Sequence, residues 1–250
     1  MQMMKEHLER DNLVIAKVLE IRQIMPSIGT RKLLYELQTT GDKRFKIGRD
    51  YLFYLLWKRG MLVKRKRRFA VTSLSRHAFK IYPNLLPETT ITHSNQVWVS
   101  DITYLRTCNG FVFLFLITDY YSRKIVGYHV SDSLATDGAC LAFERARRKI
   151  KSLDGLTHHS DHGVQYCSSK YTQMLLQHKI NISMTGDNHC YDNAVAERVN
   201  GILKQEFGLG MQMGNLKLAK EAAADAINIY NTKRPHLSLN YNTPEAVYAA

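Results

Sequence analysis

Cysteine is scarce in this 250-residue chain, and its placement argues against a small domain stabilised by disulfides or by zinc bound to paired cysteines. The four cysteines, Cys108, Cys140, Cys167 and Cys190, lie far apart, and no two of them form a Cys-x-x-Cys pair. Neither a disulfide framework nor a paired-cysteine zinc module is supported, and we expect reduced thiols in a cytosolic protein. A zinc site built from Cys167 and the nearby His162 stays open on spacing alone.

Long apolar runs are missing as well. No stretch is long enough to span a bilayer, and the N-terminus has no apolar segment of the kind that directs secretion. We therefore expect a cytoplasmic protein that has no membrane partner.

Acidic residues are few in the first 94 positions. Residues 1–94 hold 19 Lys/Arg against 8 Asp/Glu, a net charge of +11, whereas residues 95–250 hold 16 against 14, a net of +2. Between Lys43 and Lys80 there are 13 basic residues and one acid, Asp50. This density exceeds one solvated surface cluster and favours a polyanion, because each bound phosphate releases condensed counterions. Nucleic acid is the partner we expect.

The same basic region has the pattern of three short helices. Apolar spacing predicts helices within 1–24, over 31–38 after Thr30 as N-cap, and over 48–59, where Gly60 ends the third. Such an outline is typical of a helix-turn-helix module, although a plain helical bundle would give the same periodicity. A basic run directly after the third helix favours DNA binding. The predicted DNA-binding residues here are Arg31, Lys32, Arg49, Lys64, Arg65, Lys66, Arg67 and Arg68.

The composition divides the chain into two domains. We expect a helix-turn-helix domain at 1–68, an extended linker with Pro83 and Pro87 at 69–94, and a second domain at 95–250. From residue 95 the periodicity changes from that of helices to that of strands.

Strands and helices alternate in the second domain. Three adjacent antiparallel strands are expected at 96–106, 111–118 and 124–130, and Asp119 is expected to form the turn after the second. Further along, the expected elements are helices over 136–151, 168–179 and 192–207, and strands at 156–159 and 181–184. The order predicts an α/β fold, a mixed five-stranded sheet with flanking helices and a C-terminal helical extension, as in the ribonuclease H-like fold.

Three carboxylates stand in separate blocks of this domain. Asp101 lies in an apolar strand, Asp161 follows a short strand, and Glu197 lies on a predicted helix. There are 59 residues between the first pair and 35 between the second. A strand Asp, a strand-end Asp and a helix Glu can converge on one hard divalent cation. Taken singly, each Asp has an ordinary structural role as an alternative, such as a hydrogen bond to a turn.

The predicted helix around Glu197 has a polar face. Asn193 and Lys204 lie on the same face as Glu197, at spacings of three and four residues along the helix, and Asn200 or Gly201 lies between them. We expect Asn193 and Lys204 to contact DNA, although a Glu-to-Lys spacing of seven also suits an ordinary surface.

Several sequence blocks carry a family resemblance. The chain resembles the DDE transposases of the retroviral integrase superfamily, in particular the second reading-frame product of the insertion sequence 3 family. The matching blocks are Trp98-Val-Ser-Asp-Ile-Thr-Tyr-Leu105, Thr118-Asp-Tyr-Tyr-Ser-Arg-Lys-Ile-Val-Gly127, His159-Ser-Asp-His-Gly-Val-Gln-Tyr166, Asp192-Asn-Ala-Val-Ala-Glu-Arg198 and Tyr230-Asn-Thr-Lys-Arg-Pro-His-Leu-Ser-Leu239 with Thr243-Pro-Glu245.

The resemblance implies an enzyme that cleaves DNA and transfers strands at the ends of an insertion sequence. It implies that Asp101, Asp161 and Glu197 are catalytic and hold two Mg²⁺ ions, for which Mn²⁺ can substitute. It further implies double-stranded DNA as partner, a homo-oligomer in a synaptic complex, an upstream reading-frame product, and a place in the prokaryotic cytoplasm at the nucleoid.

Two other functions fit part of the pattern. A catalytically inactive helix-turn-helix regulator would share the charge and the helices, but intact carboxylates at this spacing argue against it. A retroelement-type integrase would carry an N-terminal His/Cys zinc module, and the first 94 residues contain no cysteine.

Overall fold

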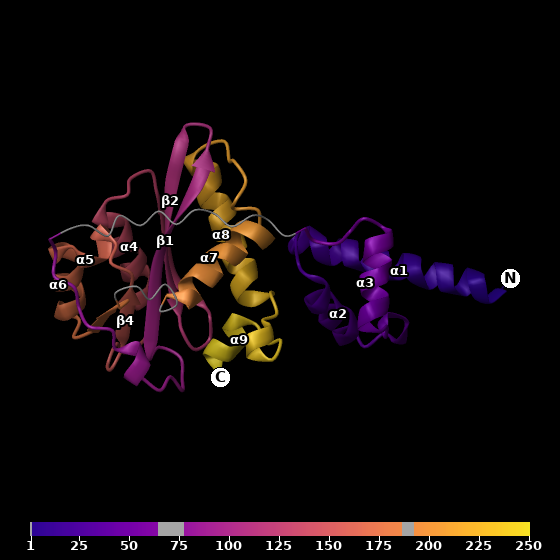
Figure 1. Cartoon of the computed structure of the whole chain (residues 1–250), viewed down its shortest axis with the longest axis horizontal. Coiled ribbons are helices and arrows are strands. Elements are labelled where there is room, and N and C mark those ends of the chain that lie inside the picture. Colours follow the sequence, from indigo (N-terminus) through magenta and orange to yellow (C-terminus); the bar gives the residue numbers. More distant parts are fainter. Residues whose placement is uncertain (1, 65–77, 187–192) are drawn as a thin grey trace.

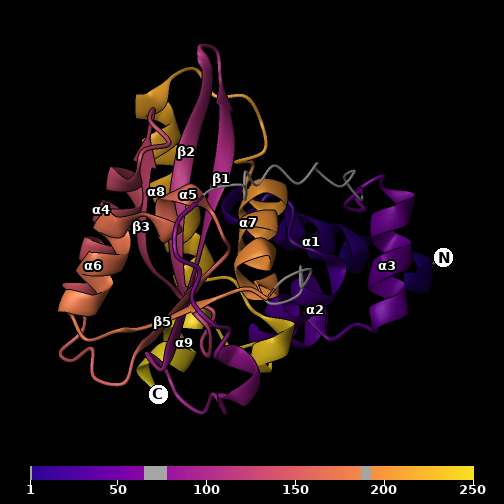
Figure 2. The ribbon, with the colours of Figure 1, turned by 60° about the vertical axis from the view of Figure 1, so that its left-hand side comes forward.

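The N-terminal part is a unit of three helices, as predicted (Figures 1 and 2). The computed structural model describes residues 2–64, 78–186 and 193–250. The helices are α1 (Gln2–Ile24), α2 (Thr30–Thr39) and α3 (Arg49–Lys58), with a 3-10 turn at Lys43–Phe45. Gly29 rather than Thr30 is the N-cap of α2. Gly60 ends α3 in the left-handed region, at φ 65°, which suits a residue without a Cβ.

A five-stranded mixed sheet forms the second part of the chain. Its strands are β1 (Val97–Thr107), β2 (Gly110–Asp119), β3 (Ile125–Ser131), β4 (Thr157–Ser160) and β5 (Asn181–Met184), in the order β3-β2-β1-β4-β5. The first three are antiparallel neighbours, while β4 and β5 run parallel to β1. The predicted fold class is confirmed.

Helices cover both faces of the sheet (Figures 1 and 2). Successive residues of β2 point to opposite faces, so Phe115 joins one buried cluster and Leu116 the other. The Phe115 cluster includes residues of α4 (Thr136–Arg147), α5 (Val164–Cys167) and α6 (Ser169–Gln177). The Leu116 cluster includes residues of α7 (Ala194–Glu206) and α8 (Leu216–Thr232).

The segment before β1 is attached to the edge of the sheet. The backbone N–H of Leu85 donates to Ser183 Oγ at 2.9 Å, and that of Met184 donates to the Pro83 carbonyl at 3.3 Å. The described part of the predicted linker, residues 78–94, is therefore extended but held along β5, and it includes a 3-10 turn at Leu86–Glu88.

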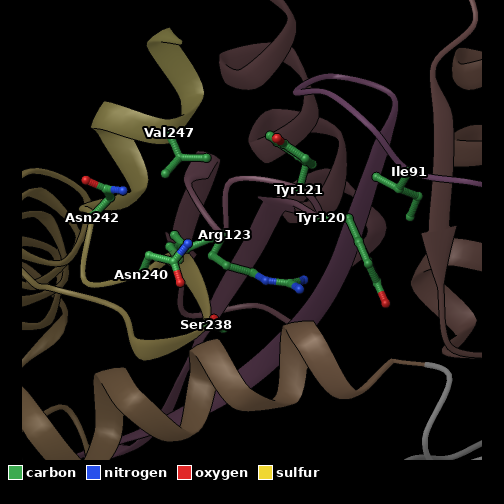
Figure 3. Close-up of a pocket in the computed structure, with 9 residues that line it drawn as sticks. Ile91, Tyr120, Tyr121, Arg123, Ser238, Asn240, Asn242 and Val247 are labelled. Carbon is green, nitrogen blue, oxygen red and sulfur yellow. The ribbon is translucent and has the colours of Figure 1, made fainter.

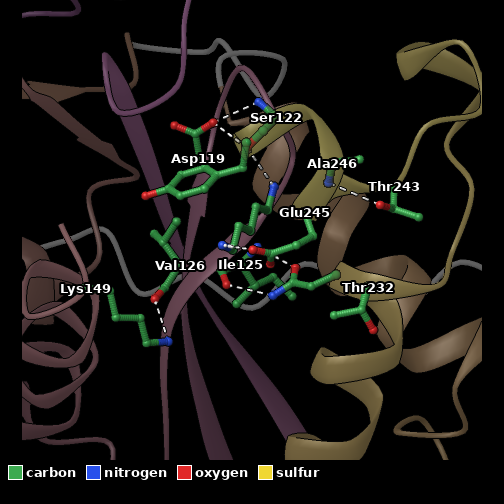
Figure 4. Close-up of polar contacts among 12 residues, drawn as sticks. Asp119, Ser122, Ile125, Val126, Lys149, Thr232, Thr243, Glu245 and Ala246 are labelled. Carbon is green, nitrogen blue, oxygen red and sulfur yellow. Dashed lines mark hydrogen bonds and ion pairs between the residues drawn. The ribbon is translucent and has the colours of Figure 1, made fainter. Parts of the chain in front are cut away.

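The last helix, α9 (Pro244–Ala249), closes onto the turn between β2 and β3 (Figure 4). Asp119 forms that turn as predicted, accepting hydrogen bonds from the Ser122 N–H and hydroxyl. Lys124 Nζ pairs with Glu245 Oε1 at 2.8 Å, which ties the turn to α9.

The two parts of the chain touch through an ion pair and a pair of stacked aromatic rings. Lys32 of α2 pairs with Glu206 at the end of α7 at 2.8 Å, and Tyr35 stacks on Tyr241 with ring centroids 4.7 Å apart. No helix in the described part of the chain is both long and apolar enough to span a membrane.

Candidate active site

The sheet brings the two aspartates to neighbouring positions. Ser100 of β1 is paired in parallel register with Ser160 of β4, and Asp101 and Asp161 are the next residues of the two chain segments. Parallel strands present equivalent residues side by side at one edge, so the two carboxylates share this edge. Glu197 lies in the first turn of α7, which packs on β1.

Two asparagines fasten α7 to β1 on either side of Glu197. Asn200 Nδ2 donates to Asp101 Oδ2 at 2.7 Å, and Asn193 Nδ2 donates to the Ser100 carbonyl at 3.1 Å. Both side chains are buried, with 6% and 5% of their surface exposed. Asn193 thus lies inside the protein, where its amide positions α7, and the structure does not place it at a DNA-facing surface as predicted.

The three carboxylates repel one another. Burial raises the pKa of Asp101 to about 7, and the charges of Asp161 and Glu197 add to the shift. Burial also raises the pKa of Asp161, which the Gly163 N–H partly offsets, and burial together with Asp161 raises the pKa of Glu197. Within residues 2–64, 78–186 and 193–250, none of the three forms an ion pair. The site therefore concentrates acidic groups that are held in no ion pair within the described part of the chain.

A hard divalent cation fits the chemistry of these donors. Carboxylate oxygens are the ligands that Mg²⁺ and Mn²⁺ favour, and the charge of such an ion would offset the repulsion that adds to the raised pKa values of Asp101 and Glu197. As they stand, no three acidic, His or Cys side chains of the described residues are close enough to hold one ion.

Lys204 also belongs to this region. Burial lowers the pKa of Lys204, and the nearby Asp101 charge partly offsets that shift. The side chain is half-buried on α7, two turns beyond Glu197. Lys204 was predicted to lie on the same helix face as Glu197, and its electrostatic interaction with Asp101 is consistent with that position.

The predicted DNA-binding residues of the N-terminal domain fall into three groups. Arg31, Arg49 and Lys64 are exposed, and Arg49 pairs with Asp50 at 2.8 Å. Lys32 is buried against Glu206, so the structure does not place it at a DNA-facing surface. Lys32 is buried because it lies on the face of α2 that meets the sheet domain. Arg65, Lys66, Arg67 and Arg68 lie outside the described residues.

A buried histidine network beneath the aspartates was not predicted. His158 Nε2 lies 2.7 Å from Ser100 Oγ and 2.9 Å from the Tyr171 hydroxyl, which joins β4, β1 and α6. Burial and the neighbouring His159 lower the pKa of His158 to about 3, so the ring is neutral. His162, considered above as a zinc ligand, has its Nε2 2.7 Å from the Thr185 carbonyl.

Comparison with known proteins places the chain in a family. Models described as "Integrase core domain" match residues 91–190 and 178–244. A 31 kDa protein of insertion element IS600 from Shigella sonnei is 36% identical over 97% of this chain and 88% of its own length. Transposase InsF of insertion sequence IS3A from Escherichia coli K12 is 30% identical over 94% of this chain and 80% of its own length. The chain belongs to the insertion-sequence transposase family. It is a DNA transposase with an integrase core domain.

Solved structures share the fold of this transposase. The HTLV-2 integrase catalytic core domain, solved with magnesium, aligns with a TM-score of 0.51 at 17% identity, over 62% of this chain and 97% of that one. The integrase of a simian T-cell lymphotropic virus intasome aligns with a TM-score of 0.53 at 15% identity, over 92% of this chain and 74% of that one. These likenesses concern the fold.

Proposed function

We propose that Asp101, Asp161 and Glu197 form the catalytic site at which this transposase cleaves DNA and transfers strands at the ends of an insertion sequence. Support comes from one observation above all: carboxylates from β1, the end of β4 and α7 share one region, where burial raises the pKa of all three and the charge of Asp161 adds to the shifts of Asp101 and Glu197. The proposal includes two Mg²⁺ ions held by these residues, with Mn²⁺ as a substitute.

The chain's own groups prepare the carboxylates for this role. Asp101 accepts one hydrogen bond at each oxygen, from the Ile102 N–H at 2.8 Å and from Asn200 at 2.7 Å. These bonds fix the plane of the carboxylate and leave a lone pair on each oxygen for a cation. When bound, the metal ions would activate a water or a 3′-hydroxyl and stabilise the leaving oxygen. Lys204 lies where it can contact a phosphate next to the carboxylates.

We also propose how the rest of the chain serves the reaction. Residues 1–68 would bind DNA as a helix-turn-helix domain through Arg31, Arg49, Lys64 and the basic run 65–68, and residues 69–94 would connect it to the catalytic domain at 95–250. Double-stranded element ends and target DNA would be held by a homo-oligomer in a synaptic complex. An upstream reading-frame product is a further proposed partner, and the prokaryotic nucleoid is the proposed place of action.

Strand cleavage on labelled DNA tests the proposal. Purified protein is mixed with a duplex carrying the terminal repeat of its own element, with and without Mg²⁺, and products are resolved by denaturing electrophoresis. We expect nicked or joined strands only with metal, and none from Asp101→Ala, Asp161→Ala or Glu197→Ala. Wild-type cleavage by all three variants would overturn the assignment. DNA binding without cleavage under any condition would favour a regulator instead.

A further inference from the structure

A cavity of about 420 Å³ lies between the β2–β3 turn and the segment before α9 (Figure 3). Tyr120, Tyr121 and Arg123 line it from the turn, and Ser238, Asn240 and Asn242 are among the residues that line the other side. Its size falls in the range of ~300–1,000 Å³ that small ligands occupy. None of these residues has a role in the proposed catalytic site.

Arg123 gives the cavity an unsatisfied positive group. Its guanidinium lies over the Tyr120 ring, 4.7 Å from the centroid, and within the described residues it forms no ion pair. Nη1 is buried without a hydrogen-bond partner in that same part of the chain. The charge of Arg123 acts on Asp119, but that carboxylate accepts its hydrogen bonds from the Asn95 and Ser122 backbone N–H groups and from the Ser122 hydroxyl instead. A buried guanidinium nitrogen without a partner is unfavourable unless an anion binds it.

Backbone strain gathers at the same place. Arg123 has φ 63°, Asn240 φ 51° and Tyr241 φ 64°, which are three of the five positive-φ residues other than glycine in the described chain. Such conformations persist where the surroundings hold them and are enriched at ligand sites. In Figure 3 the Arg123 side chain extends between the Tyr120 and Asn240 sides of the cavity. Of these three residues, Arg123 and Asn240 line the cavity, and Tyr241 directly follows Asn240 in the chain.

The cavity adjoins the proposed catalytic helix. Tyr120 and Ile91, two of its lining residues, pack against the small buried cluster that contains Ala196, with Val195 beside it. Ala196 directly precedes Glu197 in the first turn of α7. A second cavity of about 630 Å³ shares Tyr121, Asn242 and Val247 with the first, so the two cavities are neighbours.

We propose that this cavity binds an unpaired nucleotide of the DNA substrate, with a phosphate on Arg123 and the base against Tyr121. Tyr121 leaves 40% of its surface exposed, which is available for stacking. The amides of Asn240 and Asn242 can donate to and accept from a base edge. A phosphate of paired DNA would use the arginine but not the tyrosine or the amides. The inference rests on the proposed function, because it assigns the ligand to the DNA that this site would process.

DNA binding without divalent metal tests the inference apart from catalysis. Fluorescence anisotropy of the full chain is measured in EDTA with a blunt duplex and with the same duplex carrying a three-nucleotide single-stranded overhang. We expect tighter binding of the overhang duplex. Arg123→Asn should lose about tenfold or more in overhang affinity, as for one charge-assisted bond, and little in blunt affinity. Asparagine suits the positive φ at this position, so the variant should fold.

Further variants and a competitor identify the ligand. Tyr121→Leu should also remove the overhang preference while Tyr121→Phe keeps it, and Arg148→Asn, on the exposed end of α4, should match the wild type. Inorganic phosphate at millimolar concentration should compete weakly, and more with the overhang duplex than with the blunt one. The nucleotide site would be overturned if Arg123→Asn kept the preference for the overhang duplex, or if it lost the same affinity for both duplexes. Full displacement of the DNA by phosphate would also overturn it. Glu197→Gln should keep the preference without cleaving; cleavage by Glu197→Gln would count against the proposed function alone.

Discussion

Helix α7 carries two glutamates whose environments are opposite. Burial and the charge of Asp161 raise the pKa of Glu197, near the N-terminal end, and no ion pair neutralises it within the described residues. Burial alone would raise the pKa of Glu206, at the C-terminal end, but bonds from Arg234 and Lys32 lower it instead. The helix thus uses one carboxylate to connect parts of the structure and leaves the other without a counter-charge.

Two cations share the Glu206 carboxylate, and the pKa of one of them is lowered. Arg234 forms two hydrogen bonds to it, both at 2.8 Å, and Lys32 contacts the same two oxygens at 2.8 and 2.9 Å. Burial and repulsion by Arg234 lower the pKa of Lys32 to about 8, although Glu206 acts in the opposite direction. One carboxylate therefore holds two cations, one from each part of the chain, and Glu206 is the group whose loss would leave both unpaired.

The largest expected effect is on cleavage by Glu197→Gln. The amide is nearly isosteric but cannot serve as an anionic metal ligand, so Mg²⁺-dependent cleavage should fall by about 10³-fold or more. The unfolding midpoint in urea should stay the same or rise, because a repulsive charge is removed. A large loss of stability in this variant would show that Glu197, too, is a structural group.

Glu206→Gln should instead lower the stability of the folded protein. Removing the shared acceptor leaves Lys32 and Arg234 buried without their counter-charge, which should lower the unfolding free energy by about 3 kcal/mol. The check is urea unfolding followed by circular dichroism. Glu221→Gln, on an exposed position of α8, is the matched control and should change little. Stability equal to that control would contradict the linking role.

Asn200→Ala should have a smaller effect on activity. The change frees Asp101 Oδ2 from its 2.7 Å hydrogen bond and should reduce cleavage about 10–100-fold, as for other partners of metal ligands. The Mg²⁺ concentration needed for half-maximal cleavage should rise. Gln205→Ala, exposed on the same helix, should behave as the wild type. An unchanged Mg²⁺ requirement in Asn200→Ala would argue against positioning of Asp101.

The smallest expected effect is a pH dependence at limiting Mg²⁺. The pKa of Asp101 is raised to about 7, so the folded protein keeps this proton up to neutral pH, where an ordinary Asp has lost it. A protonated carboxyl is a poor metal ligand, and cleavage should therefore rise as pH increases through about 7. More Mg²⁺ should move the midpoint to lower pH. A midpoint independent of Mg²⁺ concentration would assign the titration to another group.

Local sequence predicted the elements of the fold, and it singled out the three carboxylates as candidate site residues. The alternation of apolar residues in β1 and β2 set their register, and the parallel pairing of Ser100 with Ser160 then brought Asp101 beside Asp161. Asn200 could have been assigned to this site, since it lies one turn from Glu197 on the same face. The helix face was predicted, but the hydrogen bond to Asp101 depends on how α7 crosses β1.

Tertiary contacts explain why Lys32 and Asn193, two residues predicted to bind DNA, are buried in the structure. Lys32 lies in a basic segment that suits a DNA-binding face, but its partner Glu206 is 174 residues away in the sequence. Asn193 belongs to the polar face of α7, yet that end of the face packs on the Ser100 carbonyl. No local pattern distinguishes a polar residue that faces solvent from one that faces a distant segment.

Direct metal binding tests the contrast between the two ends of α7. Free Mn²⁺ is measured by electron paramagnetic resonance as the ion is titrated into the wild type, Asp101→Asn, Glu197→Gln and Glu206→Gln, under conditions where each is folded. The predicted result is tight binding by the wild type and Glu206→Gln, and at least a tenfold loss of affinity in the other two. Equal Mn²⁺ affinity in all four proteins would contradict the assignment of the metal site to Asp101 and Glu197.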